Sequence, residues 1–344
     1  MYEAYFHLSG KPFQLNPDPS FYFGSRGHKR AFAYLEYGLY QSEGFIIITG
    51  EVGAGKTTIV RSLLEQLDPS RVIAAQLVST QLEADDLLRA VAMAFGVPVL
   101  GLDKATILAS LETFLGKVTA EGKRALLVVD EAQNLSPRAV EELRMLSNFQ
   151  RGDQALLQSF LVGQPELRDL MQSPQMQQLR QRVIASYHLG PLDDSETQGY
   201  IEHRLRHVGW SDDPKFDPAC FLPIHQATGG IPRRINTLCN RLLLAAFLSE
   251  SHELNAGDVH AIVDELKEEL GPDVPLASVS MPSGGPRVDR LSPRSDAASL
   301  HMHFDHIEER IERLEKTVAA AVDLLHRLLH PEKATKPANP GSQR

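Results

Sequence analysis

A glycine-rich stretch followed by a lysine and two threonines is the first part of this sequence that can do chemistry. Residues 50–58 read Gly-Glu-Val-Gly-Ala-Gly-Lys-Thr-Thr, and residues 50–57 match the pattern G-x-x-x-x-G-K-[S/T] at every fixed position. Glycines let a loop turn tightly and bring its backbone amides close to a polyphosphate. In such a loop the lysine, here Lys56, reaches the β- and γ-phosphates, and the hydroxyl of Thr57 binds Mg²⁺. The sequence therefore predicts an ATP–Mg²⁺ site whose loop consists of Gly50, Glu51, Val52, Gly53, Ala54, Gly55, Lys56, Thr57 and Thr58.

Two acidic residues end a second apolar run. Residues 125–131 read Ala-Leu-Leu-Val-Val-Asp-Glu, which indicates a buried strand with carboxylates at its C-terminal end. Ligands of open α/β sheets bind at that edge. We expect Asp130 to hold Mg²⁺, directly or through water, and Glu131 to polarise the water that attacks the γ-phosphate. The alternative, a strand that ends in surface acids, is disfavoured because the same chain contains the phosphate loop.

Two further polar residues are candidates for sensing the nucleotide. Gln164 follows the apolar run 156–162, so we expect its side chain at the same sheet edge as Asp130, where it would orient water or sense the γ-phosphate. The equally open alternative is a residue that caps a helix starting at the next proline. Arg233 follows Pro232 and therefore falls in the first turn of a helix. The helix dipole disfavours a cation there, which suggests an anionic partner such as the nucleotide phosphates.

A pair of arginines precedes the last predicted strand. Arg180 and Arg182 lie in Gln-Leu-Arg-Gln-Arg, residues 178–182, just before the apolar run 183–189. An arginine at this place is able to reach the γ-phosphate bound by a neighbouring subunit and to stabilise charge in the transition state. The alternative is a solvated helix end, which attracts cations in any case. Arg182 is the preferred candidate, and the sequence alone does not separate it from Arg180.

Alternating strand and helix patterns surround these candidates. Short runs rich in β-branched residues, typical of strands covered on both faces, occupy residues 45–48, 72–77, 125–129, 156–162 and 183–189. Apolar residues at helical spacing predict helices over residues 28–40, 59–67, 83–95 and 104–119. This alternation predicts an α/β fold, a three-layer sandwich with a parallel sheet and right-handed crossovers.

The predicted sandwich is flanked by two other segments. Residues 1–190 form the expected nucleotide-binding domain, and it begins with an aromatic strap in which Phe6, Phe13 and residues 21–23 surround a proline-rich stretch. Aromatic clusters usually serve packing, and the other interpretation is that part of the strap flanks the adenine. Residues 191–270 predict an all-α lid, with helices over residues 195–207, 217–228, 232–249 and 256–269.

The remaining residues predict a separate tail. Residues 271–299 are rich in Pro, Ser and Gly, as flexible linkers are. Apolar residues then recur at spacings of three and four, so residues 300–330 are predicted to form a heptad, coiled-coil helix. The alternative is an amphipathic helix that folds back on the body. The regular period and the preceding linker favour self-association or a partner helix. We expect residues 331–344 to be disordered.

Composition limits the cellular setting. The chain of 344 residues carries 35 basic and 44 acidic side chains, a net charge of −9, which argues against broad nucleic-acid binding. Cys220 and Cys239 are the only cysteines and lack metal or redox spacing, so we expect a reducing compartment. No apolar run approaches the ~20 residues of a membrane span, and the first residues do not resemble a signal peptide. We therefore expect a cytoplasmic protein that reaches the inner membrane only through a partner.

Several stretches resemble one family of ATPases. The phosphate loop and residues 127–135, Leu-Val-Val-Asp-Glu-Ala-Gln-Asn-Leu, are the Walker A and Walker B motifs that P-loop ATPases share. Residues 161–167, Leu-Val-Gly-Gln-Pro-Glu-Leu, and residues 229–236, Gly-Gly-Ile-Pro-Arg-Arg-Ile-Asn, are more specific. Through these stretches, residues 1–270 resemble AAA+ ATPases of the general secretion pathway protein A type. They are most similar to the subgroup found beside exosortase (PEP-CTERM) and exopolysaccharide genes.

The resemblance implies an activity, partners and roles for single residues. It implies ATP hydrolysis coupled to conformational work in an export or exopolysaccharide/PEP-CTERM envelope system, by a homo-oligomer with no membrane span of its own. It places a sensor 1 role on Gln164, a sensor 2 role on Arg233 and the arginine finger on Arg182. Two alternatives stay open. One is a DNA-directed ATPase of the transposition type, which shares the core motifs, and the other is a nucleotide-gated scaffold that acts through its coiled-coil tail.

Overall fold

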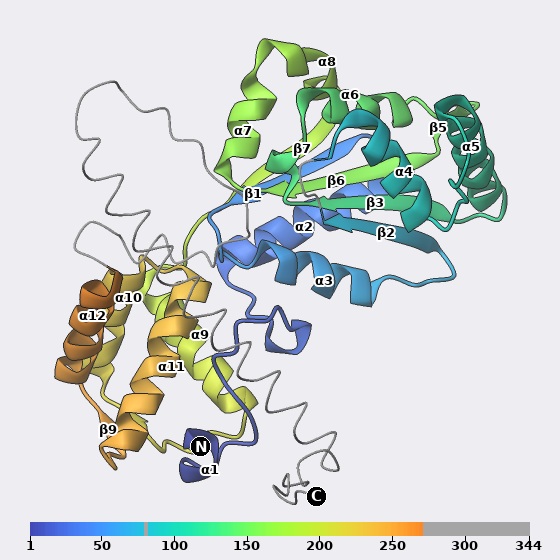
Figure 1. The fold of residues 1–344 in the computed structure, drawn as a ribbon. Coiled ribbons are helices and arrows are strands. Elements are labelled where there is room, and N and C mark those ends of the chain that lie inside the picture. The colour runs from blue at the N-terminus through green and yellow to red at the C-terminus, as the bar shows by residue number, and fades with distance from the viewer. Residues whose placement is uncertain (79–81, 271–344) are drawn as a thin grey trace, which may run out of the picture. The chain divides into compact units, whose positions relative to one another are not determined.

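A computed structural model describes residues 1–78 and 82–270 (Figure 1). The predicted linker, heptad helix and disordered end, residues 271–299, 300–330 and 331–344, lie outside these described residues. No helix within the described ranges is long and apolar enough to cross a membrane.

Five parallel strands form the central sheet, in the order β2-β3-β6-β1-β7. Their bounds are β1 Phe45–Gly50, β2 Val72–Val78, β3 Arg124–Asp130, β6 Leu157–Gly163 and β7 Val183–Leu189. Each strand coincides with a predicted one to within two residues at either end, which confirms the predicted parallel α/β sheet. The chain leaves β1 for the far edge at β2 and later returns to both neighbours of β1, β6 and β7. In open parallel sheets such a switch point opens a crevice beyond the carboxyl ends of the strands.

Helices cover both faces of this sheet (Figure 1). One face carries α2 Arg26–Gln41 and α3 Lys56–Gln66. The other face carries α4 Ala84–Ala94, α5 Lys104–Ala120, α6 Pro137–Leu146, α7 Pro165–Gln172 and α8 Gln177–Arg180. Helix α6 and the short hairpin of β4 Gln150–Arg151 with β5 Gln154–Ala155 were not predicted from the sequence. Together the sheet and its two helical layers form the three-layer sandwich that the alternating pattern predicts.

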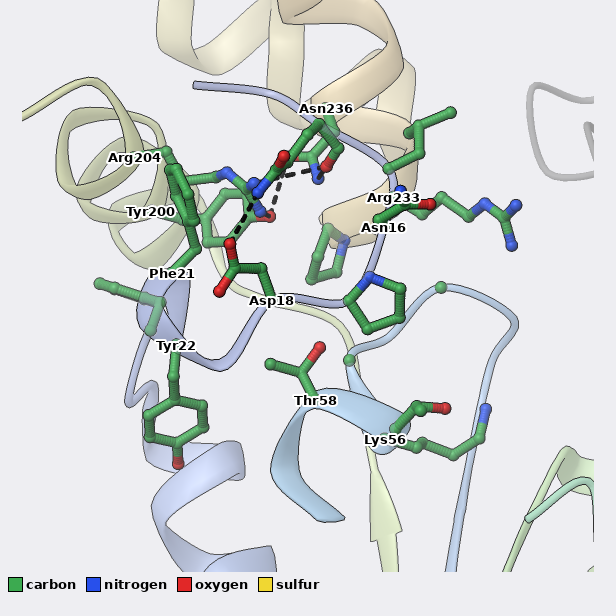
Figure 2. Close-up of a pocket in the computed structure, with 18 of the residues that line it drawn as sticks. Asn16, Asp18, Phe21, Tyr22, Lys56, Thr58, Tyr200, Arg204, Arg233 and Asn236 are labelled. Carbon is green, nitrogen blue, oxygen red and sulfur yellow. Dashed lines mark hydrogen bonds between the residues drawn. The ribbon is translucent and has the colours of Figure 1, made fainter. Parts of the chain in front are cut away.

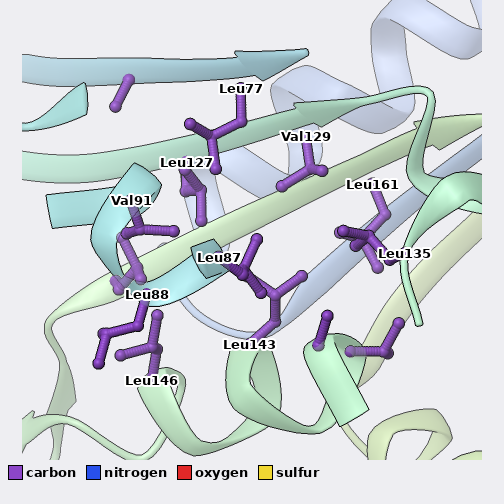
Figure 3. Close-up of a cluster of buried hydrophobic side chains, with 14 of the residues drawn as sticks. Leu77, Leu87, Leu88, Val91, Leu127, Val129, Leu135, Leu143, Leu146 and Leu161 are labelled. Atoms are coloured by element: carbon purple, nitrogen blue, oxygen red, sulfur yellow. The ribbon is translucent and has the colours of Figure 1, made fainter. Parts of the chain in front are cut away.

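Successive side chains of each strand enter opposite layers, as strand geometry requires. In β1, Ile46 and Ile48 pack under α2 and α3, whereas Phe45 and Ile47 join the opposite cluster. Figure 3 shows that second cluster, in which strand side chains meet those of two helices: Leu77, Leu127, Val129 and Leu161 face Leu87, Leu88, Val91, Leu143 and Leu146. Burying one such side chain stabilises the fold by about 1.5–3 kcal/mol. The strand ends that carry the candidate site are therefore fixed by packing on both faces.

In a separate hydrophobic cluster, the helices of residues 191–270 pack against the first residues of the chain. It contains α9 Asp194–His207, α10 Phe221–Thr228, α11 Pro232–Leu248 and α12 Ala256–Leu270, joined by the short pair β8 Lys215–Phe216 and β9 Glu253–Leu254. The predicted helix over residues 217–228 begins with a 3₁₀ turn, Pro218–Cys220. Tyr2 of the N-terminal helix α1 Tyr2–Tyr5 and the strap aromatics Phe6, Phe13 and Phe21 are buried in this cluster. Most of the strap thus packs on the helices of residues 191–270, whereas Tyr22 packs against the cluster between the sheet and helices α2 and α3.

Candidate functional site

The phosphate loop connects β1 to α3 with backbone geometry that two of its glycines make possible. Gly53 and Gly55 have φ angles of +82° and +96°, a region that side chains disfavour. A Cβ atom on Gly53 would lie 2.3 Å from the Cβ atom of Arg233, and one on Gly55 would lie 2.7 Å from Nε2 of His28. Glycine is therefore required at both positions for two reasons, the turn itself and the close approach of a neighbouring side chain.

Lys56 opens α3 and is buried inside the loop. Its Nζ donates hydrogen bonds to the carbonyl oxygens of Gly50, at 2.7 Å, and Glu51, at 2.9 Å. Burial lowers the pKa of Lys56, and the nearby carboxylates of Glu131 and Asp130 act in the opposite direction. The ammonium group is thus held among the backbone groups of the loop, at the N-terminal end of a helix, where an anion is favoured.

Thr57 and Asp130 meet at the carboxyl edge of the sheet. The Thr57 hydroxyl, in the first turn of α3, donates to Oδ2 of Asp130, the last residue of β3, at 2.9 Å. Burial raises the pKa of Asp130, and the hydrogen bonds from Thr57 and the Glu131 backbone oppose that shift. A hydroxyl and a carboxylate are oxygen ligands of the kind that Mg²⁺ takes beside phosphate oxygens. The pair therefore fits the magnesium site predicted for these two residues.

Glu131 follows β3 in an unusual backbone conformation. Its φ is +53°, and non-glycine residues in this region cost energy and cluster at functional sites. Its Oε2 accepts hydrogen bonds from two side-chain amides, Gln133 Nε2 at 2.6 Å and Gln164 Nε2 at 3.0 Å. The structure thus brings Gln164, from the end of β6, to Glu131, as expected for two residues at one sheet edge. Gln133 was not predicted, although it stands only two residues beyond the paired acids.

Arg233 joins the helical cluster to the phosphate loop. Pro232 begins α11, as predicted, and the backbone N–H of Arg233 donates to the carbonyl of Gly53 at 3.1 Å. Its side chain lines the same cavity as the loop. Within residues 1–78 and 82–270, the guanidinium of Arg233 forms no hydrogen bond or ion pair. A cation in the first turn of a helix, facing a phosphate loop, is placed to meet an anion there.

The walls of the cavity beside the loop come from four parts of the chain. Figure 2 shows residues of the N-terminal segment, of α3, of α9 and of α11 around it: Asn16, Asp18, Phe21, Tyr22, Lys56, Thr58, Tyr200, Arg204, Arg233 and Asn236. The strap aromatics Phe6, Phe13 and Phe21 are packed, and residues 14–18 and 21–23 also line the cavity, so contact of the strap with the adenine stays a prediction.

His28, in the first turn of α2, packs against the phosphate loop at Gly55. This contact was not predicted from the sequence. Its Nδ1 lies 2.7 Å from the Ser25 hydroxyl. Burial lowers the pKa of His28 to about 4, against the opposing effects of a hydrogen bond with the Ala54 backbone and the charge of Glu196. The imidazole is therefore neutral at pH 7. The sequence gives no indication of this role for His28, because only the folded chain places it next to Gly55.

The two arginines proposed as fingers lie away from this cavity. The carbonyl of Arg182 accepts a hydrogen bond from the N–H of Phe45, which places Arg182 at the amino edge of the sheet, opposite the phosphate loop. Its guanidinium donates to the Ser147 carbonyl and hydroxyl, each at 2.9 Å, and to Asn148. Arg180 donates to the carbonyls of Met171 and Ser173. Neither arginine belongs to the site of its own chain.

Comparison with known proteins agrees with this geometry. Residues 39–171 match the family model described as an AAA domain, and the sheet with its loop and paired acids has the architecture of a P-loop NTPase. The chain is 40% identical over 268 residues to general secretion pathway protein A of Aeromonas hydrophila, a match that covers 75% of this chain and 47% of that protein. The chain is similar to proteins of the general secretion pathway protein A type, and it spans about half the length of the curated relative it matches.

Solved structures extend the likeness in fold. The Aeropyrum pernix ORC1 protein, solved in complex with DNA, is 16% identical with a TM-score of 0.56, over 75% of this chain and 70% of that one. Cdc6p of Pyrobaculum aerophilum is 17% identical with a TM-score of 0.55, over 78% of this chain and 73% of that one. At such low identity these matches show the AAA fold alone.

Proposed function

We propose that this protein binds ATP with Mg²⁺ and hydrolyses it to ADP and phosphate. The observation that carries the proposal is the hydrogen bond between Thr57 and Asp130 beside the buried Lys56, because it brings the three groups that a nucleotide–metal complex needs to one sheet edge. The loop amides and the N-terminus of α3 bind the phosphates, and Lys56 contacts the β- and γ-phosphates. Thr57 and Asp130 hold Mg²⁺, which when bound neutralises charge on the phosphate oxygens.

Glu131 is the proposed general base. A water oxygen forms a bond to the γ-phosphorus while the bond from that phosphorus to the bridging oxygen of ADP breaks, and the water proton passes to the Glu131 carboxylate. Gln164 donates to Glu131 at 3.0 Å, so it is close enough to orient that water and to sense the γ-phosphate. Arg233, whose backbone is bonded to Gly53, links the phosphates to the helices of residues 191–270, the proposed lid.

The active assembly is proposed to be a homo-oligomer in which Arg182 reaches the nucleotide of a neighbouring subunit. Two facts support this arrangement. Arg182 lies at the sheet edge opposite the phosphate loop of its own chain, and an arginine supplied from a neighbour is a common device for stabilising the transition state of phosphoryl transfer. Arg180 is the second candidate for the same role.

The proposed cellular role is ATP-driven conformational work in envelope export. The similarity to general secretion pathway protein A supports a secretion-related role, and the exosortase, PEP-CTERM and exopolysaccharide setting is the narrower proposal. We place the protein at the cytoplasmic side of the inner membrane, recruited by a partner through residues 300–330. The proposed domains are residues 1–190, the lid 191–270, the linker 271–299, the coiled-coil helix and the end 331–344.

The test is ATP turnover by the purified full-length chain. Lys56→Ala should abolish both nucleotide binding and turnover, because the phosphates lose their buried cation. Lys267→Ala is the matched control, since Lys267 is exposed and pairs with Asp264 three residues earlier, and it should behave as the wild type. Undiminished turnover by Lys56→Ala would refute the site. Turnover that appears only with added DNA would favour the DNA-directed alternative over the export role.

A further inference from the structure

Gln133 closes a ring of hydrogen bonds around the proposed general base. Its Nε2 donates to Oε2 of Glu131 at 2.6 Å, and its Oε1 accepts from the backbone N–H of Gln164 at 3.0 Å. The side chain of Gln164 then donates to the same Oε2 of Glu131, at 3.0 Å. A single side-chain amide therefore ties the residue after β3 to the residue after β6.

The surroundings of Gln133 hold its amide in this orientation. Gln133 lies in the 3₁₀ turn Ala132–Asn134, whose first residue is fully buried. A Cβ atom on Gly163 would lie 2.7 Å from Oε1 of Gln133, so the amide occupies space that only a glycine leaves open. The 3₁₀ turn, the absence of a side chain at Gly163 and the hydrogen bond from the Gln164 backbone each hold the Gln133 amide in the same orientation. The ring of hydrogen bonds is therefore fixed by the surrounding structure.

The ring has a consequence for the two oxygens of the Glu131 carboxylate. Oε2 accepts both amide donors, whereas no hydrogen bond to Oε1 is found in the described part of the chain. Two donors on one oxygen fix the rotation of the carboxylate, and the other oxygen stays available to a water molecule. A positioned base removes a proton efficiently only when its accepting oxygen is held toward that proton.

We propose that Gln133 is a positioning residue that orients Glu131 for water activation and couples it to Gln164. This inference rests on the proposed ATP hydrolysis. Gln133 does not line the cavity beside the phosphate loop, and its amide bonds to Glu131 and Gln164, so we expect its loss to leave ATP binding intact and to lower the rate of the chemical step. Because Gln133 and Gln164 donate to one oxygen and bond to each other, their contributions to that rate are interdependent.

The experiment measures kcat, KM and ATP affinity for Gln133→Leu, Gln164→Leu and the double variant. Hydrogen bonds to a charged group are strong enough that each single variant should lose about ten- to a hundredfold in kcat, with ATP affinity within about twofold of the wild type. The double variant should lose little more than the worse single one. Gln66→Leu, at the exposed C-terminal end of α3, is the matched control and should keep the wild-type kcat.

A second variant, Gln133→Glu, gives a readout that a purely structural role would not move. The introduced carboxyl faces the negatively charged Glu131 carboxylate. This charge raises the pKa of the introduced carboxyl above the usual value of about 4.3. Protonation restores a donor, so the kcat of this variant relative to the wild type should rise as the pH falls from 8 to 6. A ratio that does not change with pH, or a wild-type kcat for Gln133→Leu, would overturn the positioning role alone. A wild type that binds ATP without hydrolysing it would overturn the proposed function, and the inference with it.

Discussion

At the scale of single residues, the conformation of Glu131 is the most informative. A positive φ of +53° at a non-glycine residue persists only where neighbouring contacts hold it, and here two amides hold the side chain. Glu131→Gln keeps the shape and removes the ability to accept a proton. It should bind ATP normally and lose about 10²–10⁴ in kcat, measured as phosphate release and as nucleotide retained after gel filtration. Normal turnover would show that the base is another residue.

His28 gives a pH-dependent prediction at the same scale. Its pKa is about 4 in the folded protein, below the ~6.5 of an exposed histidine, so the unfolded chain takes up the proton first. The stability due to the neutral imidazole is complete above pH 6.5 and is lost as the pH falls toward 4, an effect of about 3 kcal/mol. Urea unfolding from pH 7 to pH 4 should therefore show a steeper loss for the wild type than for His28→Gln. Parallel curves would contradict the buried, neutral state.

At the scale of elements, Arg204 of α9 fastens the N-terminal strap to the helical cluster. The side chain is buried, donates to the carbonyls of Pro12 and Gln14, and lies over the ring of Phe21 with 4.6 Å to its centre. Its acceptors are neutral oxygens, which include the Tyr200 hydroxyl at 2.9 Å. This one side chain thus links the strap to α9 beside the cavity.

Arg204→Met tests that link. It leaves a buried carbonyl without its donor, so it should lower the free energy of unfolding by about 2 kcal/mol and raise the KM for ATP, because the strap lines the cavity. Arg204→Lys should recover only part, since an ammonium lacks the planar fork of donors. Arg206→Met is the control, because Arg206 is two-thirds exposed, at 67%, and pairs with Glu202 on the surface, where such pairs contribute little. Equal effects of the Arg204 and Arg206 changes would refute the link.

The elements also show what a sequence can reveal and what it cannot. The five strands were predictable because buried parallel strands are continuous apolar runs, and Gly50–Thr57 is a contiguous motif. Helix α6 was missed although Ser136 and Pro137 supply its start and its buried face includes Val140 and Leu143. Gln133 and His28 were missed for a physical reason. Gln133 contacts Gln164, which lies 31 residues later in the chain, and His28 contacts Gly55 of the phosphate loop. Contacts between distant segments leave no periodic trace.

At the scale of the whole molecule, the position of Arg182 makes oligomer formation testable. Its side chain is bonded at the amino edge of the sheet, away from the phosphate loop of its own chain, and we propose that it acts on the site of another subunit. Specific activity should rise with protein concentration, and Arg182→Ala should lower kcat by roughly 10³ without changing ATP affinity.

Mixing inactive proteins sharpens this prediction. Subunits with Arg182→Ala retain an intact cavity, and subunits with Lys56→Ala retain an intact Arg182. A mixture should therefore recover part of the activity, because some interfaces combine both intact halves. A mixture that stays inactive, or an activity per molecule that is independent of concentration, would contradict a shared site and would favour the scaffold alternative.

The hydrophobic cluster shared by the strap and the C-terminal helices also dictates an order of events during synthesis. Phe6 and Phe13 leave the ribosome first, yet their partners on α11, such as Leu238 and Leu242, emerge more than 200 residues later. At 5–20 residues per second, that interval is roughly 10–40 s. The sheet between them is translated completely in that time. The nascent chain therefore carries the aromatic segment without its helical partners until the last helices are synthesised, and we expect a chaperone to bind in this interval.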